Sequence, residues 1–198
     1  MPITYPYDLL ASFPGWSTEF DLLWRQEQSR QANGRTIVKD MGSPLWRAIY
    51  QSRQMKPNEL DFWRARLDAM ENGLKTFFGR PLSRCRPINN PGSAVLPSGT
   101  LSAIQADRKT ITVGGLTGIT LRPGDMVCIR DKDLHRVVDG TGAAVEVRPH
   151  IWPGVTTGAT VSVTKPHCIM AIVPGSISTA ADAATGRGVV SFQAIEAR

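Results

Sequence analysis

Residues 121–129, Leu-Arg-Pro-Gly-Asp-Met-Val-Cys-Ile, decide the fold class of this chain. Proline followed by glycine is typical of the central positions of a type II turn, and the apolar run that follows has the length of a short strand. Similar strands, separated by turn residues, recur roughly every dozen residues on both sides. The predicted strands are 110–113, 124–129, 134–138, 144–147 and 159–163. This spacing predicts a small β-barrel or sandwich.

The first fifty residues carry a second β pattern. Residues 19–30 and 35–40 flank Asn33-Gly34, and Asn-Gly between two strand-like runs is the strongest short-range hairpin signal, because both residues accept a positive φ. A third run follows at 45–51, so we expect an antiparallel meander of three strands. Residues 1–15 are rich in proline and aromatic residues, which predicts an extended arm docked on a neighbouring subunit or, alternatively, a frayed terminus.

One segment has helical periodicity, and it predicts a single α-helix over residues 57–74 that packs on the sheet. Asn58 or Pro57 suits its start and Gly73 its end. The apolar residues that recur at spacings of three and four are Leu60, Trp63, Leu67, Met70 and Leu74. Strands are also predicted at 76–78, 168–173 and 189–195, with loops at 79–100 and 175–188.

The composition is that of a soluble globular protein. Of the 198 residues, 41% are apolar and 20% are charged, and the net charge is +6 without any run of five like charges. No apolar run of about 18 residues predicts a membrane span. The N-terminus lacks a basic region followed by an apolar stretch, so we expect no signal peptide and residence in the cytoplasm until assembly.

Patterns that carry catalytic chemistry are missing from the sequence. The three cysteines, Cys85, Cys128 and Cys168, are odd in number and far apart, which predicts buried or half-buried thiols, although a disulfide between subunits stays open. The three histidines and the acidic residues show no metal-ligand spacing, and no phosphate-binding glycine motif occurs. We therefore expect no enzyme, no catalytic residues, no cofactor and no metal. A thiol hydrolase that uses one of the cysteines is the enzymatic alternative.

Two further groups of residues have alternative interpretations. Asp131, Asp133 and Asp139 resemble Ca²⁺ ligands, but Lys132 and the absence of a terminal glutamate favour a solvated turn. Five tryptophans are interpreted as core or subunit-contact residues, the alternative being stacking platforms for sugars or single-stranded nucleic acid. They are Trp16, Trp24, Trp46, Trp63 and Trp152.

Several short motifs together resemble a known family. They are Trp24–Arg30, Asn33–Arg35, Leu45-Trp46, Asn58–Trp63, Glu71–Gly73, Phe77-Phe78, Leu121–Asp125, Val147–Pro149 and Val190–Glu196. In this order they are similar to the distal tail proteins of long-tailed bacteriophages and gene transfer agents. The resemblance implies a tail-tube-like β-sandwich flanked by a helix. It also implies a virion protein of the tail tip, with a homo-oligomeric ring, expected to be a hexamer, that joins the tail tube protein to the baseplate hub.

The resemblance also shapes the expected domain organisation and partners. Residues 91–166 are predicted to be an inserted barrel module, and residues 1–90 with 167–198 to form the tail-tube-like unit. The partners it implies are other tail-tip proteins and DNA in transient passage through the ring, with no membrane and no catalytic residues. The alternative function is a carbohydrate- or nucleic-acid-binding β module. We also predict that the loops at 79–100 and 175–188 lie at subunit contacts.

Overall fold

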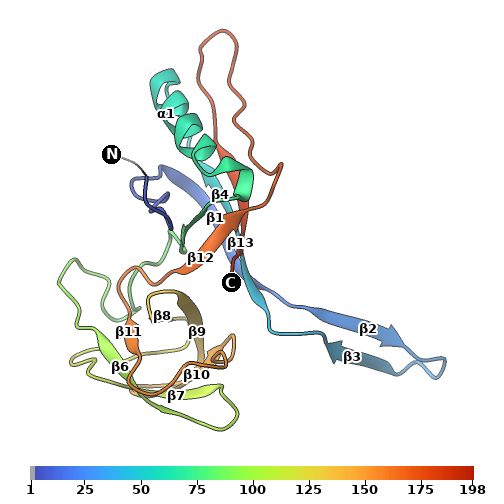
Figure 1. Cartoon of the computed structure of the whole chain (residues 1–198), viewed down its shortest axis with the longest axis vertical. Coiled ribbons are helices and arrows are strands. Elements are labelled where there is room, and N and C mark those ends of the chain that lie inside the picture. Colours follow the sequence, from blue (N-terminus) through green and yellow to red (C-terminus); the bar gives the residue numbers. More distant parts are fainter. Residues whose placement is uncertain (1–2) are drawn as a thin grey trace.

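The computed structural model describes residues 3–198 and contains three β assemblies and one α-helix (Figure 1). The assemblies are a five-stranded sheet, a closed six-stranded barrel and a separate two-stranded ribbon. The predicted fold class, mainly β with one helix and a small barrel, is therefore confirmed. No helix within residues 3–198 is long and apolar enough to cross a membrane.

The five-stranded sheet is antiparallel and joins the two ends of the chain. Its order is β1-β4-β13-β12-β5. The strands are β1 (Gly15–Leu23), β4 (Leu45–Ser52), β5 (Thr76–Gly79), β12 (Cys168–Ile172) and β13 (Ser191–Glu196). Along β4, β12, β13 and β5, buried residues alternate with more exposed ones, as expected for a sheet with one face against a core.

The barrel is formed by the segment between β5 and β12. Its strands are β6 (Gly99–Ile104), β7 (Thr110–Gly114), β8 (Met126–Ile129), β9 (Asp133–Gly140), β10 (Ala144–Arg148) and β11 (Thr160–Ser162). The predicted turn before β8 is present: Gly124 has φ +95°, and the Asp125 amide donates to the Arg122 carbonyl at 3.0 Å. Strand β6 is missing from the predicted strands: its first two residues fall in the predicted loop at 79–100 and residues 101–104 have no predicted element, because the turn residues Pro97 to Gly99 hide the alternation that follows.

The predicted three-stranded meander is wrong. The Asn33-Gly34 hairpin exists, but its strands β2 (Gln26–Arg30) and β3 (Thr36–Asp40) pair only with each other, while β1 pairs with β4. Every residue of β2 and β3 is exposed. The physical reason is that β2 is polar throughout, so it has no apolar face to bury on the sheet.

The sheet packs its buried face against α1 and the N-terminal segment, where a two-sheet sandwich would place a second sheet. Helix α1 (Pro57–Asp68) is followed by the 3₁₀ turn η1 (Glu71–Gly73), so the regular helix ends before the predicted residue 74. The prediction of a docked or frayed arm at residues 1–15 is wrong for its described part, since Leu9, Leu10 and Phe13 are buried in the chain's own core. Met1 and Pro2 lie outside the described residues.

Buried contacts join the barrel to the sheet. Met126 and Leu134 of the barrel belong to the same apolar cluster as the sheet core. The indole Nε1 of Trp46 donates to the Leu134 carbonyl at 2.8 Å, and Arg136 donates to the Phe20 carbonyl at 2.9 Å. The predicted division at 90–91 and 166–167 stays a prediction, because a strand order alone does not define which segments fold independently.

Candidate functional site

The projecting ribbon is the most unusual surface of the molecule. Figure 1 shows β2 and β3 extending away from the sheet, the helix and the barrel. The register pairs Glu27 with Lys39, an opposite-charge pair, and places Ile37 and Val38 on opposite faces. Ile37 is 45% exposed and Val38 is 57% exposed. Since neither face has a core behind it, both faces are available to a partner.

The base of the ribbon continues into an open sheet edge. Strand β1 pairs only with β4, so its other side has no strand partner among the described residues. Trp16 and Trp24, at the start of β1 and just beyond its end, are both exposed. An unpaired strand edge with exposed aromatic residues beside it is a typical place for another chain to add a strand.

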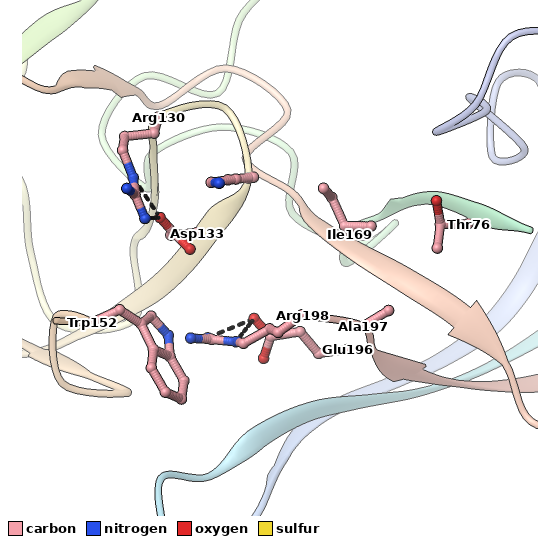
Figure 2. A pocket seen from close by; sticks show the side chains of 9 residues that line it. Thr76, Arg130, Asp133, Trp152, Ile169, Glu196, Ala197 and Arg198 are labelled. Carbon is pink, nitrogen blue, oxygen red and sulfur yellow. Dashed lines mark hydrogen bonds and ion pairs between the residues drawn. The ribbon is translucent and has the colours of Figure 1, made fainter. Parts of the chain in front are cut away.

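A cleft of about 490 Å³ lies between the barrel and the sheet (Figure 2). Its lining residues come from β5, the β8–β9 turn, the start of β9, the segment after β10, β12, and the end of β13 with the two residues beyond it. Those drawn and labelled are Thr76, Arg130, Asp133, Trp152, Ile169, Glu196, Ala197 and Arg198. Lys132 completes the lining. The cleft thus combines three cations, two carboxylates and an indole ring.

Two ion pairs hold charged side chains of this cleft in place. The guanidinium of Arg130 donates twice to Asp133 Oδ2, at 3.0 and 2.8 Å. Arg198 pairs with Glu196 Oε1 at 2.6 Å, and its guanidinium carbon lies 3.2 Å from the centroid of the Trp152 ring. Burial raises the pKa of Glu196, an effect that the Arg198 charge opposes. No ion pair of Lys132 is found within residues 3–198, which leaves this charge free to meet an anion.

Burial makes two of the three candidate thiols poor nucleophiles. It raises the pKa of the Cys128 thiol to about 12 and that of Cys168 well above its ordinary value. A reactive cysteine needs the opposite shift and solvent access. Cys85 is half-buried, and its Sγ lies 3.4 Å from the Pro81 carbonyl. All three thiols are free, and the intersubunit disulfide is untested by a single chain.

The acidic residues of the β8–β9 region separate into different environments. Asp133 is buried in its ion pair with Arg130, whereas Asp131 and Asp139 are exposed. The interpretation of all three as a solvated turn is therefore wrong for Asp133. The contact is local, since Arg130 and Asp133 are three residues apart, but the sequence does not reveal the left-handed backbone that Arg130 and Asp131 adopt in this turn.

The tryptophans divide into two groups. Trp46 and Trp63 are buried in the core and Trp152 lines the cleft. Trp16 is 80% exposed and Trp24 is 50% exposed, so they have no core role in the single chain. These two are left for a contact between chains or for a ligand.

Comparison of the chain with models of known protein families and with curated protein sequences gave no match.

Proposed function

We propose that this protein is a structural component of a bacteriophage tail tip, which assembles into a ring, expected to be a hexamer, between the tail tube and the baseplate hub. The observation that carries the proposal is the β2–β3 ribbon. A two-stranded hairpin is at best marginally stable in water on its own, because it has no third strand or core to cover it. That β2 and β3 form a fully exposed ribbon therefore suggests that the ribbon contacts a partner in the assembled state.

The chemistry of the ribbon favours a protein partner. Ile37, Val38 and Met41 are each at least 45% exposed, and they stand among polar and charged residues. Mixed apolar and polar surfaces of this kind are ordinary for protein–protein contacts. The open edge of β1 supplies a second surface of the same kind, so each copy has an element that reaches out and an edge that accepts. Two different complementary patches are what a head-to-tail ring requires.

The first experiment is the mass of the purified chain in solution, measured by light scattering over a series of concentrations. We expect a closed oligomer near six copies, or a monomer that closes as concentration rises. The test variant is Val38→Asp, which places a charge on the ribbon without touching any core. The matched control is Leu74→Asp, because Leu74 is 80% exposed but lies beyond α1, away from the ribbon. The proposal predicts that Val38→Asp weakens assembly and that Leu74→Asp does not.

The opposite result is equally clear. A strict monomer at every concentration, with identical behaviour of both variants, would count against a self-closing ring. The same preparation is then mixed with purified tail tubes. If the ribbon is needed for ring assembly, the wild-type chain must bind to the tubes and the Val38→Asp chain must not. Failure of both measurements would end the ring proposal.

The cleft favours one alternative function, a carbohydrate- or nucleic-acid-binding module. The indole Nε1 of Trp152 has no hydrogen-bond partner within residues 3–198, and Arg130 and Lys132 line the same cleft. The Nε1 atom is buried and Arg198 covers one face of the ring, so a sugar or base would have to stack on the other face or displace Arg198. Titration with short single-stranded oligonucleotides and with oligosaccharides tests this. Quenching of tryptophan fluorescence that disappears in Trp152→Phe would support it, and no quenching would exclude it.

A further inference from the structure

Three side chains with metal-binding chemistry meet where the chain leaves the barrel for the sheet. Cys128 lies on β8, Asp131 lies in the turn between β8 and β9, and His167 immediately precedes β12. One ligand atom from each lies within 4.8 Å of the other two. Cys128 is buried, His167 is half-buried and Asp131 is exposed, so the cluster has a protein wall on one side and solvent on the other.

The hydrogen bonds of His167 leave one ring nitrogen among electron-rich atoms. Its Nδ1 lies 3.1 Å from the Lys165 carbonyl and its Nε2 lies 3.0 Å from the Asp131 carbonyl, and both carbonyls only accept, so a neutral ring with one N–H can donate to only one of them. A ring that binds a metal through Nε2 carries its hydrogen on Nδ1. The lone pair of Nε2 then faces the carbonyl oxygen of Asp131 at 3.0 Å and its carboxylate at 3.5 Å. An acceptor that faces two acceptors is electrostatically unfavourable. A cation placed among these atoms, either a proton on Nε2 or a metal ion, removes the conflict.

We propose that Cys128 Sγ, His167 Nε2 and the Asp131 carboxylate bind a divalent zinc ion, with water or the Asp131 carbonyl in the fourth position. Thiolate, imidazole and carboxylate together are a donor set that zinc accepts. The bond from Nδ1–H to the Lys165 carbonyl is the outer contact that orients most metal-binding histidines. Tetrahedral zinc spaces its ligand atoms about 3.3–3.8 Å apart, so the cluster needs to contract by only about 1 Å.

Zinc binding at this site requires the loss of the thiol proton. In the metal-free protein Cys128 Sγ donates to the His167 carbonyl at 3.1 Å. When the sulfur–zinc bond forms, that hydrogen bond breaks and the proton leaves to solvent. Because a proton and the metal compete for the same sulfur, zinc affinity should rise with pH.

The site would fix the barrel relative to the sheet. The ring of His167 packs edge-on against Phe78 of β5, with centroids 4.6 Å apart. A zinc ion bound both by His167 and by ligands from β8 and the β8–β9 turn would link the segment that enters β12 to the barrel. This role is independent of the proposed ring, since it concerns a single chain.

The experiment uses the full chain after treatment with a chelator, titrated with Co²⁺ and then Zn²⁺ at pH 8. We expect one Co²⁺ per chain, a thiolate-to-cobalt absorption band in the near ultraviolet, its loss when Zn²⁺ is added, and a higher thermal midpoint with zinc. The band should weaken at least tenfold at pH 6. Its test variants are Asp131→Ala, whose side chain is exposed, and His167→Gln. The matched controls are Cys85→Ser and Asp139→Asn, a thiol and an exposed carboxylate outside the cluster.

The outcomes divide cleanly. Loss or strong weakening of the band in both test variants, with both controls unchanged, supports the site. Absence of a saturable band, or a band that survives Asp131→Ala and His167→Gln, overturns it. The exposed position of Asp131 makes its variant informative even if a change at Cys128 fails to fold.

Discussion

The free energy of unfolding of this protein should fall in mild acid because of the buried residue His135. The side chain is fully buried on β9, where its Nδ1 lies 2.9 Å from the Pro149 carbonyl and its Nε2 has no hydrogen-bond partner in the described residues. Burial lowers the pKa of His135 from 6.5 to about 4. A charged imidazolium is disfavoured there because it would lose its hydration, and the Pro149 carbonyl and the Asp133 charge offset only part of that loss.

The sign and size follow from proton linkage. Between pH 6.5 and about 4 the unfolded chain binds a proton at His135 that the folded chain does not. The free energy of unfolding therefore falls as the pH falls through this window, and the contribution is fully present above it. A difference of about 2.5 pKa units corresponds to roughly 3 kcal/mol.

The assay is urea unfolding followed by tryptophan fluorescence at several pH values from 7.5 to 4. The variant His135→Gln keeps a donor for the Pro149 carbonyl but cannot titrate, so its unfolding free energy should depend less on pH by about 3 kcal/mol over the window. The matched control is His150→Gln, at a half-buried histidine whose pKa is also lowered by burial, and its effect should be smaller. Identical pH slopes for the wild-type protein and His135→Gln would refute the reasoning.

Three other substitutions test the packing within the barrel, within the sheet region and between the two, each by urea unfolding. Trp46→Phe removes the indole donor to the Leu134 carbonyl and should cost about 1–3 kcal/mol, because a buried acceptor is left unpaired; an unchanged stability would mean that this contact between barrel and sheet is dispensable. Leu101→Ala opens a cavity in the barrel core and should cost about 2–5 kcal/mol. Gly73→Ala should cost at least about 1–3 kcal/mol, since Gly73 has φ +100° and a Cβ there would overlap the Ile172 carbonyl; a neutral result would mean that η1 shifts freely.

Local chemistry is enough to predict five of the six barrel strands, all but β6, and the helix. The Pro123-Gly124 turn and the alternation around it identify β7 to β10 because turn residues and period-two burial are both visible in the sequence. The sequence predicts helix α1 because Leu60, Trp63 and Leu67, which form its buried face, recur at helical spacing. The N-terminal segment was misjudged because prolines predict extended backbone correctly but say nothing about what it packs on. Leu9 and Leu10 belong to a buried cluster that also contains distant residues such as Trp63, Phe77 and Phe192.

The candidate sites depend on contacts that no local pattern contains. Cys128 and His167 are 39 residues apart and belong to different elements, so their approach follows from the path by which the chain leaves the closed barrel and re-enters the sheet. The separation of the ribbon from the sheet could not be predicted for a different reason. Its Asn-Gly turn predicts a hairpin equally well inside or outside a sheet, and only the lack of an apolar stripe in Gln26–Arg30 separates the two cases. A strand pair without such a stripe gains little from the chain's own core. This lack of a core contact is the reason for proposing that the ribbon contacts another molecule.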